Sequence, residues 1–208
     1  MSAAIEPSGI GAVILAAGSS TRFGSPKQLL EIDGQALLQR AIEAAIQAGL
    51  KPVVVVLGAN AMMIAPSLAE SDAVSVVVNH DWENGQASSL AVGITAANND
   101  RLRGVIVMLA DQPGVDANSL ERLVGAFDNE HRVIAAAYSD TVGAPVLFGM
   151  EYLPALTTLS GDHGAGGWLR AHPDAVTAIE MAEAALDIDT PADFFLHSPR
   201  HGNKGNST

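Results

Sequence analysis

The fold is decided by one stretch of the chain, Val13-Ile14-Leu15-Ala16-Ala17-Gly18-Ser19-Ser20-Thr21-Arg22-Phe23-Gly24-Ser25-Pro26-Lys27-Gln28-Leu29-Leu30. The apolar run from Gly11 to Leu15 predicts a buried strand, and the small residues after it predict a loop at the carboxyl end of that strand. Two glycines, Gly18 and Gly24, allow the backbone to approach a ligand closely and to present its N–H groups. Such a loop is suited to holding phosphate oxygens.

The loop also gathers hydroxyl groups, from Ser20 and its two neighbours, and the positive charges of Arg22 and Lys27. It is not a P-loop, because five residues instead of four separate its glycines and Gln28 follows the lysine. It is not a dinucleotide fingerprint, because no G-x-G-x-x-G follows the strand. The alternative is an ordinary glycine-rich turn with two solvated basic residues. The convergence of small and basic residues on one loop of an acidic chain favours phosphate binding.

Composition limits the classes of ligand. The chain has 208 residues, 48% of them hydrophobic, which is enough for the core of one α/β domain, assigned to residues 1–197. The formal net charge of −12, with 11 Lys and Arg residues, argues against nucleic acid or an anionic membrane as a partner. An anionic ligand must therefore bind at a local positive site.

Three further features concern location and chemistry. Cysteine is absent, so disulfides, thiolate metal sites and thiol nucleophiles are excluded. The segment from Met1 to Gly9 lacks the character of a signal peptide, and no apolar run reaches the roughly 20 residues that a spanning helix needs. We therefore expect a cytoplasmic protein. Residues 198–208 are polar and lack an apolar anchor, which predicts a disordered tail.

Strand and helix patterns alternate along the rest of the chain. This alternation predicts a layered, mostly parallel sheet with ligands at the carboxyl ends of its strands. Pro145, near the start of one strand, predicts an edge position for it. The predicted strands are residues 11–15, 53–57, 74–78, 105–109, 133–138, 141–148 and 175–179, and the predicted helices are residues 36–48, 60–68, 87–97, 116–129, 151–156, 168–171 and one that begins at Pro191.

The order Leu-Ala-Ala-Gly-x-Ser-x-Arg-x-Gly-x-Pro-Lys-x-Leu-Leu, at residues 15–30, resembles the signature of the MobA-like nucleotidyltransferases. Its Ala-Ala pair is most similar to the molybdenum cofactor cytidylyltransferase branch. The resemblance implies a three-layer, Rossmann-like nucleotidyltransferase (GT-A-like) fold with a mostly parallel central sheet. It covers residues 12–196 and continues in four segments, residues 79–90, 109–113, 161–165 and 187–193.

The resemblance implies a nucleotide site built from the first loop and from the segment Asn-x-x-Trp-x-x-Gly-x-x-Ser-Ser, which lies beside the nucleotide in the family. From the local sequence alone, a serine of that segment is as well explained by capping of the helix that follows. The residues assigned to the nucleotide are Leu15, Ala16, Ala17, Gly18, Ser19, Ser20, Gly85, Ser88 and Ser89, and those assigned to catalysis are Arg22 and Lys27.

A Mg²⁺ site is expected from carboxylates. Asp111 follows the apolar strand 105–109, where it can hold a hard cation or can start a turn with Pro113. The resemblance favours the metal role. It also implies a second metal ligand near the carboxyl terminus, for which we favour Asp187 over Asp189, because Asp189 could instead cap the last helix.

The acceptor side is expected at the glycine-rich loop that contains Gly161, Asp162 and His163, although a solvated histidine would explain His163 equally well. Here the chain departs from the family at two positions. Ala144 stands where relatives commonly carry His, and Gly166 stands where many carry Arg. Both departures remove side chains from the acceptor side.

The resemblance implies a Mg²⁺-dependent transfer of CMP from CTP onto a phosphorylated small molecule, molybdopterin, with release of pyrophosphate. A molybdoenzyme is then a potential protein partner. Direct attack of an acceptor phosphate needs positioning and electrostatics but no covalent nucleophile. The alternatives are a sugar-phosphate or alditol-phosphate nucleotidyltransferase, a MobA-like oxidoreductase of a nicotine-derived pigment, and a non-catalytic carrier of the finished cofactor.

Overall fold

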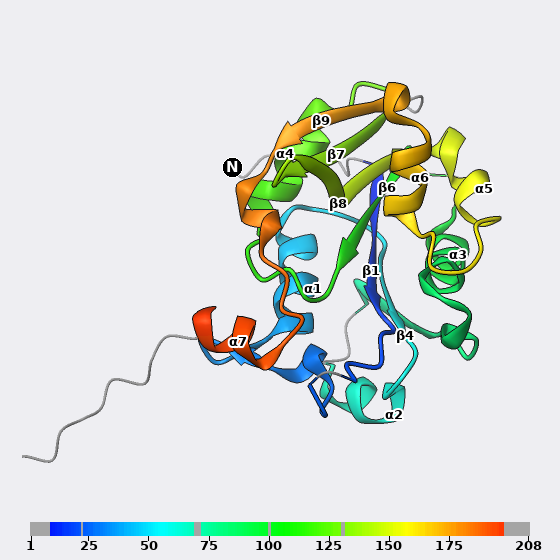
Figure 1. Ribbon diagram of the computed structural model, residues 1–208. Coiled ribbons are helices and arrows are strands. Elements are labelled where there is room, and N and C mark those ends of the chain that lie inside the picture. The colour runs from blue at the N-terminus through cyan, green and yellow to red at the C-terminus, as the bar shows by residue number, and fades with distance from the viewer. Residues whose placement is uncertain (1–8, 22, 69–71, 100, 130–131, 198–208) are drawn as a thin grey trace, which may run out of the picture.

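A seven-stranded sheet forms the centre of the computed structural model, which describes residues 9–21, 23–68, 72–99, 101–129 and 132–197 (Figure 1). The strand order is β5-β4-β1-β6-β8-β7-β9, and every neighbouring pair is parallel except those that involve β8. The mostly parallel α/β sheet predicted from the sequence is therefore confirmed. The strands are β1 Ile10–Ala16, β4 Val53–Leu57, β5 Val74–Val78, β6 Gly104–Leu109, β7 Val133–Tyr138, β8 Thr141–Gly149 and β9 Val176–Glu180.

Strand β1 lies inside the sheet, between β4 and β6, and every one of its residues is buried. Its neighbours β4 and β6 are continuous apolar runs, as expected of parallel strands that are covered on both faces. Because the three strands are parallel, their carboxyl ends meet at one edge of the sheet. The loop after β1 and the segment after β6 are thereby brought side by side.

The edge position expected for the strand with Pro145 is wrong, because β8 lies between β6 and β7. Pro145 is nevertheless compatible with an interior strand. The pairing of β7 with β8 shifts between Ala135 and Ala136, so that Pro145 falls in the irregularity and has no ladder partner there. The missing N–H of proline therefore costs no strand hydrogen bond.

Helices cover both faces of the sheet and give the expected three layers (Figure 1). Alternate residues of β1 point to opposite faces. Ile14 belongs to the apolar cluster that includes residues of α1 and α4, whereas Val13 belongs to the cluster that includes residues of α3 and α6. The α-helices are α1 Leu37–Gln47, α2 Ala61–Ile64, α3 Gln86–Ala97, α4 Ala117–Ala126, α5 Leu153–Leu156, α6 Ala165–Ala171 and α7 Pro191–His197.

Short elements complete the chain. A small hairpin of β2 Glu31–Ile32 and β3 Gln35–Ala36 precedes α1. Together with α7 it encloses a small apolar cluster that includes Ile188. The 3-10 helices are Lys27–Leu29, Ala65–Ser67, Trp82–Asn84, Met150–Tyr152, Pro173–Ala175 and Ala182–Ala185.

Two expectations from the sequence concern residues outside the described part of the chain, namely the disordered tail at 198–208 and the placement of Arg22. Among the helices that the structure describes, none combines the length and the apolar character needed to traverse a membrane.

Candidate active site

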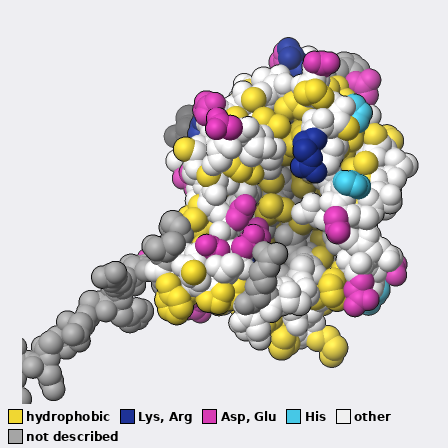
Figure 2. Space-filling model, in the orientation of Figure 1, with side chains coloured by type: hydrophobic (Ala, Val, Ile, Leu, Met, Phe, Trp, Pro, Cys, Tyr) yellow, Lys and Arg dark blue, Asp and Glu magenta, His cyan; other side chains and the backbone are white. Residues whose placement is uncertain are grey.

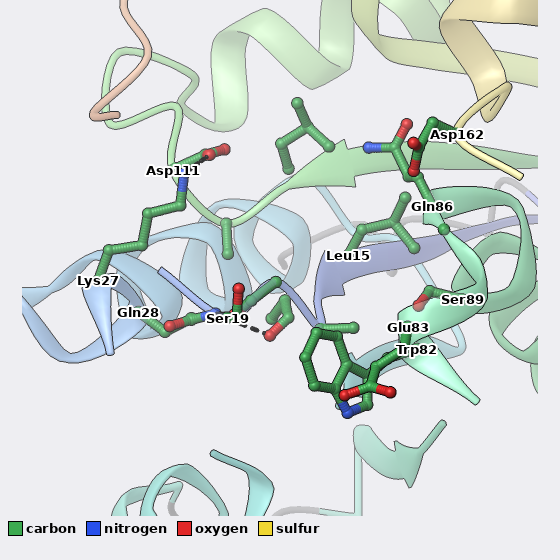
Figure 3. Close-up of a pocket in the computed structure, with 16 residues that line it drawn as sticks. Leu15, Ser19, Lys27, Gln28, Trp82, Glu83, Gln86, Ser89, Asp111 and Asp162 are labelled. Carbon is green, nitrogen blue, oxygen red and sulfur yellow. Dashed lines mark hydrogen bonds and ion pairs between the residues drawn. The ribbon is translucent and has the colours of Figure 1, made fainter. Parts of the chain in front are cut away.

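A cavity of about 380 Å³ opens at the carboxyl ends of β1 and β6 (Figure 3). Its walls come from the loop after β1, the start of α3, the end of β6 and the loop before α6. In Figure 3, Leu15 lies between Lys27 and Asp111 on one side and Gln86 and Asp162 on the other. The cavity therefore lies where the sequence predicts ligands to gather, at the edge of the sheet formed by the strand ends.

Gln28 holds the loop after β1 in shape. Its side chain is 2% exposed, and its amide nitrogen donates hydrogen bonds to the carbonyl oxygens of Ala16 at 2.9 Å and Gly18 at 3.1 Å. The Ser20 hydroxyl donates to the Gln28 carbonyl oxygen at 3.3 Å and accepts a hydrogen bond from the N–H of Lys27 at 3.1 Å. The carbonyl oxygens of Ala16 and Gly18 are thus hydrogen-bonded on the side of the loop that faces the protein interior. These bonds fix the conformation of the loop that carries Lys27.

Lys27 lies between two carboxylates from distant parts of the chain. Its ammonium group donates to Asp111, at the end of β6, and to Asp189, before α7, at 3.0 Å. Burial lowers the pKa of Lys27, but the charges and hydrogen bonds of the two carboxylates outweigh it and raise the pKa above the ordinary 10.5. Lys27 is therefore a fixed positive charge at the mouth of the cavity.

A third carboxylate, Asp187, stands close enough to this group to be affected by it. Loss of hydration raises the pKa of Asp187 to about 6, and the negative charges of Asp111 and Asp189 add to the increase. Acidic side chains gather beside the hollow in the middle of the face shown in Figure 2. A nearby cation stabilises such a cluster of carboxylates, and in the structure the ammonium group of Lys27 is that cation.

The capping alternative for Asp189 does not apply. Thr190 and Asp193 form the cap of α7, because the Asp193 carboxylate accepts from the Thr190 N–H at 2.8 Å and the Thr190 hydroxyl accepts from the Asp193 N–H at 3.3 Å. The Asp189 carboxylate is consequently turned to Lys27. The reason for preferring Asp187 to Asp189 as a metal ligand is therefore removed.

The carboxylates fit a Mg²⁺ ion that is shared with a substrate. Within the described residues, no three His, Cys, Asp or Glu side chains are arranged as a complete metal site. Mg²⁺ is commonly held by one or two carboxylates, with phosphate oxygens and water as the other ligands. Asp111 with Asp187 or Asp189 offers that number of protein oxygens next to the cavity.

The second wall of the cavity is the start of α3. Asn79, 2% exposed, donates hydrogen bonds to the hydroxyls of Ser88 at 2.8 Å and Ser89 at 3.0 Å, which ties the end of β5 to the helix. Ser89 and Gly85 line the cavity. Ser88 lies outside the lining, and its hydroxyl is directed to the carbonyl oxygens of Asp81 and Gly85.

The loop before α6 packs closely against the start of α3. Gly85 has a φ of +99°, and a Cβ atom there would lie 2.3 Å from the carbonyl carbon of Gly161. The Gly161 carbonyl oxygen accepts a hydrogen bond from the N–H of Ala87 at 3.1 Å. Glycine at position 85 therefore allows the expected acceptor loop to contact the nucleotide side of the cavity, with Asp162 in the lining.

The structure thus brings most of the predicted site residues, but not all of them, to the wall of the cavity. Ser20, Ser88, Gly161, His163, Asp187 and Asp189 lie outside the lining of the cavity, although Asp189 binds Lys27, and Arg22 lies outside the described residues. The predicted residues that line the cavity are Leu15, Ala16, Ala17, Gly18, Ser19, Lys27, Gly85, Ser89, Asp111 and Asp162.

Sequence reasoning missed three buried amides that shape the site. Besides Gln28 and Asn79, Gln112 is 4% exposed and donates to the carbonyl oxygens of Ala144 at 3.2 Å and Ala184 at 2.9 Å. These bonds tie the segment after β6 to β8 and to the chain before α7. Their position in the chain is the available signal, since each amide lies inside a segment that resembles the family's site segments.

The sequence matches the family model described as MobA-like NTP transferase domain over residues 12–176. Nicotine blue oxidoreductase from Paenarthrobacter nicotinovorans is 36% identical over 189 residues, which cover 86% of this chain and 91% of that protein. Purine catabolism protein PucB from Bacillus subtilis is 28% identical over 191 residues, which cover 88% of this chain and 92% of that protein.

Solved structures share the fold of this chain. The crystal structure of Rv0371c from Mycobacterium tuberculosis H37Rv has 32% sequence identity and a TM-score of 0.76, and it covers 90% of this chain and 96% of that chain. Rv0371c has also been solved in complex with manganese, with 31% identity and a TM-score of 0.73 over the same shares of the two chains. That relative therefore binds a divalent metal.

Proposed function

Because the chain belongs to the MobA-like NTP transferase family, we propose that it moves CMP from CTP onto a phosphorylated acceptor, molybdopterin, and releases pyrophosphate. The observation that carries the proposal is the position of Lys27, which is held between Asp111 and Asp189 at the mouth of the cavity. A nucleoside triphosphate needs such a positive charge beside carboxylates that can share a metal ion with its phosphates.

In this proposal the loop after β1 holds the phosphates, since its shape is fixed by Gln28 and since Gly18 and Ser19 line the cavity. Lys27 neutralises the charge that builds on the α-phosphate and the departing pyrophosphate. Arg22 is proposed to share this role. When bound at Asp111 and a second carboxylate, Mg²⁺ would act as a Lewis acid that polarises the phosphoryl oxygens.

The acceptor then attacks the α-phosphorus directly. Its phosphate oxygen forms the new P–O bond while the bond to pyrophosphate breaks, so that no covalent intermediate with the protein is needed. The protein contributes by orienting the two substrates, because the Gly85–Gly161 contact fixes the acceptor loop against the nucleotide wall.

The preference for CTP is proposed from Ala17, whose methyl group would crowd a purine more than a pyrimidine. In the structure the Ala17 Cβ packs on Gly58, where an added Cβ would lie 2.8 Å from it. This packing is an independent reason for alanine. Competition binding of CTP and GTP to the Ala17→Gly variant distinguishes contact with the base from packing on Gly58. If the methyl group contacts the base, the variant should reduce a CTP preference of ~10- to 100-fold; if the methyl group only packs on Gly58, the preference should not change.

The test of the function is pyrophosphate release with each nucleoside triphosphate, Mg²⁺ and a panel of acceptors that includes molybdopterin and sugar phosphates. The proposal predicts release with CTP and molybdopterin above the rate with either alone. Release that requires a sugar phosphate would move the assignment to that class of transferase, and binding without release would leave a carrier of the finished cofactor.

The similarity to nicotine blue oxidoreductase favours a second candidate function, reduction of a pigment by a reduced nicotinamide. The loop after β1 lacks a G-x-G-x-x-G fingerprint for such a cofactor. The two functions have separate readouts. Loss of nicotinamide absorbance on addition of the pigment, without pyrophosphate release in the first assay, would establish the oxidoreductase and refute the transferase.

A further inference from the structure

Two anionic substrates that meet in one cleft need more positive charge than the cavity lining supplies. Among the described residues that line it, Lys27 is the one basic side chain, whereas Glu83, Asp111 and Asp162 contribute three carboxylates. A phosphorylated acceptor must approach this site past those negative charges. In the proposed function Lys27, Arg22 and Mg²⁺ serve the donor phosphates, so a further cation is expected on the acceptor side, at the carboxyl edge of the sheet.

Most other basic residues of the described chain are unsuited to this role. Four of them precede β4, β6 or β7 at the amino end of the parallel strands, which is the opposite edge of the sheet, and two are engaged by carboxylates, Arg40 by Asp33 at 3.7 Å and Arg122 by Glu183 at 2.8 Å. The four at the opposite edge are Lys51, Arg101, Arg103 and Arg132. Of the eight basic residues in the described chain, this leaves Arg170 besides Lys27.

Arg170 is exposed on α6, and no described carboxylate forms an ion pair with it. Its side chain leans back toward the start of the helix, as long helical side chains do. One guanidinium nitrogen lies 3.5 Å from the point where a Cβ atom of Gly166 would be, which is an ordinary contact distance. The guanidinium group of Arg170 therefore lies over the first turn of α6.

The next glycine leaves room for a second nitrogen-bearing side chain. His163 lies over Gly167, with its Cβ 3.0 Å and its Nδ1 3.5 Å from the position of a Cβ atom on that glycine. Arg170 and His163 therefore both lie over the first turn of α6, next to Gly166 and Gly167.

This pair adjoins the cavity through the loop before α6. In that loop Asp162 lines the cavity, and a Cβ atom on Gly164 would lie 2.4 Å from the Gln86 side-chain oxygen of α3. The negative charges of Glu83 and Asp162 would repel an anionic group from the nucleotide wall, whereas Arg170 would attract it. A phosphate monoester is the group that a guanidinium binds best, through two parallel hydrogen bonds.

We propose that Arg170, beside His163, binds the phosphate group of the acceptor, so that this end of the cleft selects phosphate monoesters over their unphosphorylated counterparts. The proposal rests on the proposed function, and it assigns to Arg170 the charge that Gly166 cannot supply. Glycine at position 167 fits this arrangement, because a Cβ atom there would lie 3.0 Å from the Cβ of His163.

The first test is direct binding of inorganic phosphate, followed by the backbone amide NMR signals of the full chain. Mg²⁺ and a CTP analogue with a non-cleavable link between the α- and β-phosphates occupy the donor site. The wild type is expected to show saturable shifts at Gly166 and Gly167, and Arg170→Gln is expected to raise the phosphate Kd at least ~10-fold, the loss typical of one charge-assisted contact. Arg170→Lys should retain part of the affinity.

The matched control is Arg132→Gln, which removes the same charge from the opposite edge of the sheet, where Arg132 pairs with Asp128. It should leave the phosphate Kd unchanged. Equal Kd values for Arg170→Gln and the wild type would overturn the proposal. So would equal weakening in both glutamine variants, because that result would reflect net charge, and so would an absence of shifts at Gly166 and Gly167.

The second test uses transfer and separates this proposal from the proposed function. Arg170→Gln should raise the KM of the phosphorylated acceptor at least ~10-fold and leave the KM of CTP unchanged. Transfer with an unchanged acceptor KM would refute the role of Arg170 while the transferase stands. Phosphate binding at Arg170 in a protein that releases no pyrophosphate with any acceptor would support the site and refute the transferase.

Discussion

Replacing Lys27 by alanine should damage catalysis much more than folding, and the structure allows both losses to be bounded. The Lys27 and Asp111 side chains are 18% and 17% exposed, and that of Asp189 is 54% exposed. Exposed ion pairs contribute ~0.2 to 1 kcal/mol, while breaking a fully buried pair costs ~3 to 5 kcal/mol. For this intermediate case, we expect the free energy of unfolding to fall by about 1 to 2 kcal/mol.

The catalytic loss should be larger. A preorganised donor at the point where charge develops contributes ~100-fold or more to kcat. Turnover is measured as pyrophosphate release at saturating CTP and acceptor, and stability by urea denaturation of the metal-free protein. Lys51→Ala is the matched control, since it removes an exposed lysine at the opposite edge of the sheet and should change neither quantity measurably. Wild-type turnover in a folded Lys27→Ala protein would refute the role of Lys27.

Three other predictions follow from the same site. Asp111→Asn should abolish the Mg²⁺-dependent turnover, and an unchanged Mg²⁺ activation curve would reduce Asp111 to a turn residue. Gln28→Leu should lower the free energy of unfolding by ~1 to 3 kcal/mol and raise the KM of CTP, because two loop carbonyls lose their donor; Gln39→Leu, on the surface of α1, should do neither. Because the pKa of Asp187 is raised, the folded protein retains on this carboxyl group a proton that the unfolded chain has already lost. The contribution of Asp187 to the free energy of unfolding is therefore greatest below about pH 3.8 and is lost as the pH rises through about 6. Asp187→Asn should remove that fall in urea titrations of metal-free protein, and a parallel pH dependence in the two proteins would contradict it.

Much of the fold could be predicted from the sequence because the central strands are continuous apolar runs. β1, β4 and β6 are buried on both faces, so burial and pattern agree along these strands up to Leu109, the half-buried last residue of β6. The site could be located for the same reason, since polar residues at the ends of such strands meet at one edge. Lys27 and Asp111 are 84 residues apart in the chain, and parallel pairing of β1 with β6 brings them into contact.

What could not be predicted depends on contacts that sequence patterns do not encode. The edge position inferred from Pro145 failed because a pairing irregularity can accommodate a proline inside a sheet. The choice between Asp187 and Asp189 could not be made from spacing, because it depends on whether Thr190 caps α7. The role of Gln28 depends on burial, which no local pattern around a polar residue reveals.

The most direct test of nucleotidyl transfer uses CTP labelled with ³²P at the α-phosphate. The labelled CTP, Mg²⁺ and molybdopterin are incubated with the wild type and with the Lys27→Ala variant. We expect the label to move to the acceptor with one pyrophosphate released per transfer, and we expect this transfer to fall at least ~100-fold in the variant. Label that remains in CTP with every acceptor tested, or transfer that is equal in the two proteins, would contradict these expectations.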